Sequence, residues 1–344
     1  MRGIIAWQRA LMFGALLAAA PLPAAAQDAN SFYKGQTLHL IVGSAVGGGY
    51  DAYARLMADH MPRHIPGNPS IVIQNMPGAG SLVATNYIAN VAPKDGTAIG
   101  AINPLMATAS LLNPERTKFD PRQINWIGAL IRETHVGVVR AASPVKTLDD
   151  ARQHETLVSG TGGSTDTYPV IMNALLGTKF KVVSGYSGTA QGLLAVERGE
   201  VDGNVGITWN SLKATQAAAL RDGRIRVFAQ FGLKKDPELA NASSAFDEAK
   251  TPETKAGLRL LFSIQEMGRP FIAPSGVPAP LLAVLRKAFD ETVKDPQFRA
   301  DAEKRHLDVD PTSGAEIQSI IEDIYKTPPQ VVTQMQTFLK GTAQ

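Results

Sequence analysis

The feature that most constrains this fold is a recurring order of short apolar segment, glycine-containing loop and helical pattern. In its first occurrence, the apolar segment 37–42 (TLHLIV) leads through the glycines 47–49 into apolar and aromatic residues at helical spacing. The same order recurs at 71–91 and at 156–176. Regular alternation of strands and helices with short loops predicts an α/β fold, with mostly parallel sheets covered by helices on both faces.

The alternation continues along the chain and predicts two α/β lobes. Further strands are expected at 97–102, 135–139, 180–186, 200–207 and 224–232, and a strand, turn and helix over 269–289. Thr147, with Asp150 three residues later, is predicted to cap a helix. The stretch 234–268 is polar and is predicted to be irregular. A chain of 344 residues exceeds the usual size of one domain, which also favours two lobes.

The N-terminal segment has the pattern of an export signal. Arg2 and Arg9 give it a positive start, and the apolar run 10–26 ends in small residues. This predicts a cleaved signal peptide over 1–26 and a mature protein that begins at Gln27. A membrane anchor is the alternative, but the run is short and contains two prolines. We therefore expect an exported, periplasmic protein.

Charge and cysteine content exclude several classes of function. The formal net charge of +3 falls to +1 once Arg2 and Arg9 leave with the signal peptide, and no basic stripe is present. Nucleic acid is therefore not an expected partner. The chain has no cysteine, which rules out disulfides and thiolate chemistry.

A dinucleotide-binding enzyme is one alternative that the first glycine loop raises. Gly47, Gly49 and Ala52 match the pattern G-x-G-x-x-A after a strand. The next strand ends without an acidic residue for a ribose, and Asp51 would repel a pyrophosphate. Neither a nucleophile elbow, an H-E-x-x-H motif nor a P-loop occurs in the sequence. We expect no catalytic residues and no cofactor.

A metal site is not expected either. His60 and His64 lie four residues apart, which is a spacing found in metal sites. No third ligand is evident near them, and a zinc site needs at least three protein ligands.

Glycine loops before helices are well suited to binding anions. Helix N-termini carry free N–H groups and partial positive charge, and glycine lets an anion approach them. The candidate loops are 47–51, 77–81 and 160–165. The alternative for each loop is that it only connects a strand to a helix and binds nothing. Ligands bind open α/β sheets at the carboxyl ends of the strands, so two such edges facing each other across a hinge would form a clamp.

Five segments in a fixed order resemble a known family. They are the glycine loop with Asp51 and Arg55, then QNMPGAGSLVATNYIANVAPKDGTAIG, VSGTGGST, GYSGTAQGLLAVERGEVDG and PFIAPSGVPAPLL. In these the chain resembles the extracytoplasmic solute receptors of the tripartite tricarboxylate transporters, also called the Bug family.

The resemblance implies a fold and a function. The fold is a type II-like, two-lobed periplasmic binding protein, with two doubly wound α/β domains joined by a hinge. Lobe 1 would comprise 27–128 plus about 232–344, and lobe 2 about 129–231. The implied function is capture of a small organic carboxylate and its delivery to the membrane subunits of a transporter, by a monomeric receptor without enzymatic activity.

The resemblance also implies ligand-binding residues on both lobes. Carried over by position they are Ser44, Val46, Gly47, Gly48, Gly49, Tyr50, Asp51, Ser159, Thr161, Gly162, Gly163, Ser164, Thr165, Tyr186, Gly188, Thr189 and Asp202. Trp209 follows a predicted strand and belongs either to the cleft or to the core. Tyr50 is either a lid over the ligand or part of the core face of its helix.

Two other functions fit the same fold. An exported enzyme acting on a carboxylated compound would use Asp51 or Asp202 as acid or base. A sensor would present the liganded protein to a signalling partner. Fold alone does not choose among these functions.

Overall fold

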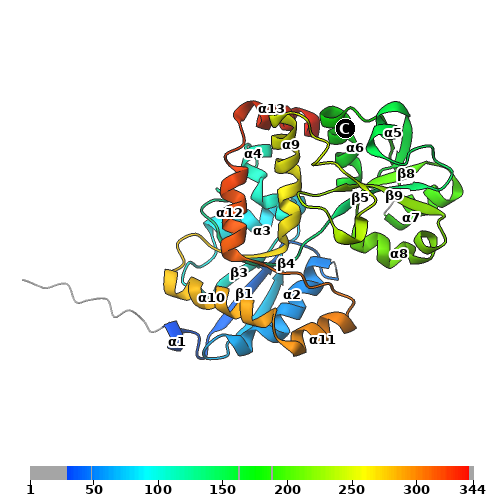
Figure 1. Ribbon diagram of the computed structural model, residues 1–344. Coiled ribbons are helices and arrows are strands. Elements are labelled where there is room, and N and C mark those ends of the chain that lie inside the picture. The colour runs from blue at the N-terminus through cyan, green and yellow to red at the C-terminus, as the bar shows by residue number, and fades with distance from the viewer. Residues whose placement is uncertain (1–28, 48, 162, 187–188, 341–344) are drawn as a thin grey trace, which may run out of the picture.

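The computed structural model describes residues 29–47, 49–161, 163–186 and 189–340, and it has two lobes (Figure 1). Each lobe is built on a six-stranded sheet within the described residues. In strand order, the first sheet contains β12 (Thr312–Ser313), β4 (Asn125–Ile131), β11 (Gly268–Ala273), β3 (Ala98–Ala101), β1 (Thr37–Val42) and β2 (Ser70–Asn75). The second contains β10 (Ser243–Ser244), β9 (Ile225–Phe231), β5 (His135–Arg140), β8 (Gly203–Thr208), β6 (Thr156–Ser159) and β7 (Phe180–Val183).

Helices cover both sheets. Those of the first lobe are α1 (Ala29–Phe32), α2 (Gly49–His60), α3 (Leu82–Asn90), α4 (Ala109–Leu112), α10 (Ala279–Thr292), α11 (Pro296–Lys304) and α12 (Gly314–Ile324). The second lobe contributes α5 (Leu148–Gln153), α6 (Ser164–Leu176), α7 (Thr189–Arg198) and α8 (Trp209–Arg221). Two helices, α9 (Pro252–Phe262) and α13 (Pro329–Lys340), pack against α6 in one apolar cluster. Short 3₁₀ turns occur at Met61–His64, Ala79–Ser81, Pro104–Ala107, Pro237–Leu239 and Ser263–Met267.

Alternation along β1 explains why its sheet is covered on both faces. Leu40 packs with Leu56 of α2, whereas the neighbouring Ile41 packs with Ile88 of α3 in a separate cluster. All four side chains are almost completely buried. Successive strand residues point to opposite faces, so a run of apolar residues places one core above the sheet and one below it.

The sheets are mixed, which corrects the expectation of mostly parallel sheets. The strands β1, β2 and β3 are parallel, as are β6, β7 and β8. However, β11 is antiparallel to β3 and β4, and β5 is antiparallel to β8 and β9. The short connection 132–134 runs directly from the end of β4 to the start of β5. The chain enters both β5 and β11 from the other lobe. Each of these strands therefore starts at the edge of its sheet where the parallel strands end.

Most of the predicted elements are confirmed, and two regions differ. The strands at 37–42, 71–75, 135–139 and 269 onward are present, as is the capping box of Thr147 with Asp150. Strand β4 was not predicted, and the expectation of an irregular stretch over 234–268 is wrong for α9. That helix begins after the N-cap Thr251, and its buried apolar residues include Leu258 and Leu261.

The lobe boundaries remain a prediction. Strand β10 pairs with β9 in the second sheet, although it follows residue 231. The predicted signal peptide, 1–26, lies outside the described residues. Among the helices that the structure describes, none has both the length and the apolar character needed to cross a membrane.

Candidate functional site

The loop between β1 and α2 forms one wall of the candidate site and is held from inside by Asp51. The Asp51 carboxylate is 2% exposed and accepts hydrogen bonds from the Gly47 N–H (2.9 Å), the Arg55 guanidinium (2.9 Å) and the Asn75 amide (2.9 Å). The bond from Arg55, together with those from Gly47 and Asn75, lowers the pKa of Asp51 to about 2. The carboxylate is therefore ionised and fully occupied in fixing the loop.

The remaining residues of this loop have different surroundings. Val46 is 71% exposed, and the Ser44 carbonyl accepts a bond of 3.0 Å from Asn75. Tyr50 is half-buried and packs against the first-lobe core, which agrees with its core-face alternative. Gly49 begins α2, and the predicted ligand residue Gly48 lies outside the described residues.

Ser81 joins this wall to the next loop. Its hydroxyl donates to the Gly43 carbonyl (2.9 Å) and accepts from the Asn103 N–H (3.0 Å). These residues follow β1 and β3, so one buried hydroxyl ties the carboxyl ends of both strands together.

The loop between β6 and α6 forms the second wall and is held by neutral groups. Thr165 Oγ1 accepts a bond of 2.9 Å from the Thr161 N–H and lies 3.0 Å from Thr161 Oγ1. The Asn204 amide donates to both the carbonyl and the hydroxyl of Ser159, each at 3.0 Å. Gly163, at φ +64°, leads into Ser164 at the start of α6. The predicted residue Gly162 lies outside the described part of the chain.

The starts of α7 and α8 lie at the same edge of the second sheet. Thr189 begins α7, Tyr186 before it is partly buried in the second-lobe core, and Gly188 is not among the described residues. Trp209 begins α8, where its indole Nε1 donates to Glu238 (2.6 Å). It is partly exposed, and its ring also packs beside the core cluster.

Asp202 is not brought to this edge. It precedes β8 and therefore lies at the opposite end of that strand from Trp209. Its carboxylate pairs with Arg140 (2.9 Å) and accepts from the Leu157 N–H (3.1 Å). This arrangement joins strand ends on the far side of the sheet.

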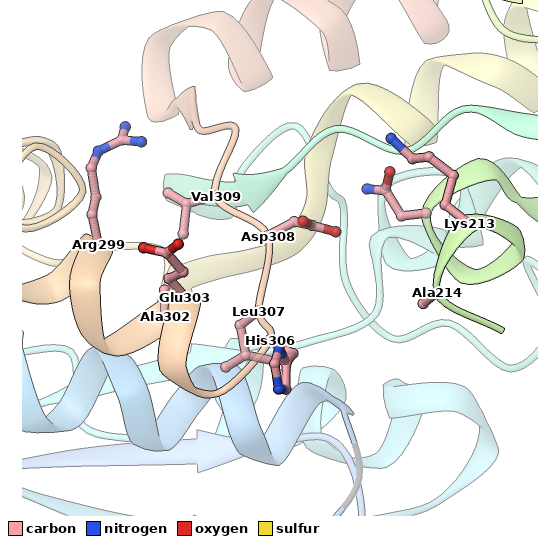
Figure 2. Close-up of a pocket in the computed structure, with 10 residues that line it drawn as sticks. Lys213, Ala214, Arg299, Ala302, Glu303, His306, Leu307, Asp308 and Val309 are labelled. Atoms are coloured by element: carbon pink, nitrogen blue, oxygen red, sulfur yellow. The ribbon is translucent and has the colours of Figure 1, made fainter. Parts of the chain in front are cut away.

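A cavity separates the two lobes on one side of the site. It has a volume of about 560 Å³ and lies between α8 and the segment that includes Asp308 and Val309 (Figure 2). In Figure 2, Lys213 and Ala214 stand across the space from Asp308. A second cavity of about 300 Å³ shares Asp308 and Val309 and reaches Trp209 and Thr134. The second cavity also reaches Arg132 and Thr134 of the connection between the lobes, whereas the residues that line these two cavities do not include the glycine loops.

A polar cluster lies beside this connection, and we term it the floor cluster: Tyr50, Glu133, His135, Gln265 and Arg269. Of these residues, only Tyr50 was predicted to belong to the site. Arg269 Nη2 lies 3.4 Å from Glu133 Oε1, and the Arg269 Cζ lies 4.4 Å from the centre of the Tyr50 ring. Burial raises the pKa of Tyr50 to about 12, so its phenol is neutral and can donate. The prediction considered only strand ends, whereas His135 and Arg269 occur at the starts of β5 and β11. The available signal was a lone arginine, Arg269, at the start of an otherwise apolar strand.

Two α/β lobes with a short connection between them, helix N-termini at the inner edges and a cavity in the gap define a two-lobed solute-binding protein. Within that class, a family model described as the tripartite tricarboxylate transporter family receptor, TctC, matches residues 53–337. The chain belongs to this receptor family, which confirms the resemblance seen in the sequence. The match begins after the first glycine loop.

Relatives and solved structures agree with this assignment. The chain is 26% identical to a UPF0065 protein encoded in the gbd 5′ region of Cupriavidus necator, over 86% of this chain and 85% of that one. A TctC solute-binding protein from Polaromonas has a TM-score of 0.68 at 16% identity, over 90% of this chain and 99% of the other. MatC from Rhodopseudomonas palustris, solved with bound malate, has a TM-score of 0.56 at 21% identity, over 86% and 99% of the two chains.

Proposed function

We propose that this protein is a periplasmic receptor that captures a small organic carboxylate between its two lobes. The observation that carries the proposal is the placement of two glycine loops, each leading into a helix N-terminus, after parallel strands of the two sheets of a TctC-family chain. Free N–H groups at such positions favour anions. The malate found in MatC supports a carboxylate as the class of cargo.

Capture would proceed by closure of the lobes around the cargo. The connection 132–134 between β4 and β5 is short, and the chain returns to the first lobe through the turn Ser263–Met267. Such crossings act as hinges, and a ligand favours the closed form only to the extent that it binds that form better. The first wall would supply N–H donors to the cargo. The hydroxyls of the second wall would distinguish among cargo molecules by the arrangement of their oxygen atoms.

The closed receptor would then deliver its cargo to membrane subunits of a tripartite transporter. This step rests on family membership, as do export to the periplasm and the absence of turnover. We further propose that the mature receptor acts as a monomer.

A thermal-shift screen of the mature protein, 27–344, tests the proposal. The panel is acetate, benzoate, succinate, L-malate, adipate and citrate, with the corresponding amides as matched controls. An acid present at a hundred times its Kd stabilises the folded protein by about 2.7 kcal/mol. We expect one class of acid to raise the Tm, its amide to have no effect, and mass spectrometry to recover the acid unchanged. A flat panel would overturn the carboxylate assignment, and consumption of an acid would indicate an enzyme.

A further inference from the structure

Arg269 has a backbone conformation that few residues with side chains adopt. Its φ is +57° at the second residue of β11, in the left-handed region that favours glycine. An arginine held there is a local cost that the surrounding structure must offset, and such residues concentrate at functional sites. The neighbouring Gly268 and Pro270 are buried in the sheet, where Gly268 pairs with Ile131, so the backbone of Arg269 is held next to the connection 132–134.

The guanidinium of Arg269 lies over two tyrosine rings. The Cζ atom lies 4.4 Å from the centre of the Tyr50 ring and 5.6 Å from that of Tyr53. A guanidinium has five N–H donors around its rim, in a fork that matches a carboxylate. The one acidic partner that the described residues give it is Glu133, at 3.4 Å and from a single oxygen.

One donor of this arginine has no acceptor. In the described part of the chain, the buried Nε of Arg269 has no hydrogen-bond partner. A buried donor without a partner costs free energy, so an acceptor that reaches it is bound favourably. Arg269 itself keeps 22% of its side chain exposed, which leaves the guanidinium within reach of a molecule in the cleft.

The guanidinium also lies beside the first wall. A Cβ added to Gly49 would stand 3.7 Å from Arg269 Nη2, so the start of α2 and the arginine border the same space. The partial positive charge at the start of α2 and the guanidinium of Arg269 thus lie next to each other. Glu133 compensates the charge of Arg269.

We propose that Arg269 binds a carboxylate group of the cargo in its plane, and that Glu133 positions the guanidinium for this contact. The inference rests on the proposed carboxylate receptor function and names the residue that selects for charge. Arg269 makes the site specific for fully ionised acids over their amides and esters, because neutral groups gain little from a charged fork. The contact lies beside the connection 132–134 and borders the first glycine loop at Gly49.

Calorimetric titration of wild type and three variants with the same acid panel tests this role. In R269Q the charge and the fork are removed. In R269G they are also removed, but the backbone conformation is one that glycine adopts freely, which protects the fold. The matched control is R122Q, because Arg122 is exposed, pairs with Asp120 at 2.7 Å and lies near the opposite end of β4.

We expect both Arg269 variants to bind the best acid about 10- to 100-fold more weakly than wild type, the range of a charge-assisted hydrogen bond. Their preference for acid over amide should collapse, and R122Q should bind as wild type does. Unchanged affinity in a folded R269G would overturn the role of Arg269 while leaving the receptor intact. If wild type itself binds no acid in the panel, the proposed function fails instead.

Discussion

The two walls of the cleft are fixed by different chemistry. The first loop is held by an ionised, buried carboxylate, Asp51, with three donors around it. The second loop is held by the neutral hydroxyls of Thr161 and Thr165. A buried ionic network orients a backbone strongly but loses much when one member is removed, whereas a neutral pair contributes less and stays adaptable. We therefore expect the bonds of Asp51 to make the first wall a rigid platform, and the second wall to be where selectivity among cargo molecules varies.

The largest effect expected from this comparison is that of D51N. The amide keeps the shape of Asp51 but lacks the negative charge to which Arg55 and the Gly47 N–H donate hydrogen bonds. We expect the free energy of unfolding to fall by about 2 kcal/mol, as measured by urea denaturation. The matched control is D149N, because Asp149 is 76% exposed and its ion pair in the described part of the chain is with its helix neighbour Arg152. Equal, small losses in both variants would show that the first wall does not depend on its carboxylate.

Acid should weaken the first wall selectively. The pKa of Asp51 is lowered to about 2 in the folded protein, by Arg55 above all. A depressed pKa contributes stability above the unfolded value of about 4, and that contribution is lost as the pH falls from about 4 towards 2. Urea midpoints of wild type and D51N should therefore converge between pH 7 and pH 3. A difference that stays constant over this range would contradict the assignment.

The second wall should respond less. In T165V the methyl groups preserve the volume, but the acceptor for the Thr161 N–H is removed. We expect a loss of about 1 kcal/mol in unfolding free energy, half that of D51N, with little dependence on pH. Wild-type-like stability would mean that water replaces the hydroxyl, and a loss larger than that of D51N would reverse the comparison of the two walls.

The smallest effect on stability is expected at Ser44. Among the described residues its hydroxyl reaches only the Ala45 carbonyl, at 3.4 Å, so S44A should change the unfolding free energy by less than about 0.5 kcal/mol. Any larger consequence should be on cargo binding, measured by titration with the acid panel. A marked loss of stability would show that Ser44 belongs to the platform held by Asp51.

The sequence predicted the fold through local patterns and missed what depends on strand direction. The glycine loops, the capping box of Thr147 and most strands are local features, and they occur where the pattern places them. The direction of β5 and β11 depends on which lobe the chain comes from, which no local window records. The floor cluster follows from that direction, so Arg269 and Glu133 were not among the predicted site residues.

The roles of single residues were also beyond local pattern. Asp51 matched a ligand position in the sequence, but its carboxylate is turned into its own loop by Arg55 and Asn75. Asp202 matched a cleft position as well, yet it precedes β8 and bonds on the far side of the sheet. The partners of Asp202 lie far away in the sequence, whereas Asp51 is held by Gly47 and Arg55, each four residues away, and by the more distant Asn75.

Small-angle X-ray scattering of the mature protein, without and with the acid that stabilises it best, tests the central claim most directly. Closure of two lobes on a carboxylate predicts a smaller radius of gyration at saturating acid and no change with the corresponding amide. Saturable binding of the acid at one site per chain with an unchanged radius of gyration would contradict capture by lobe closure.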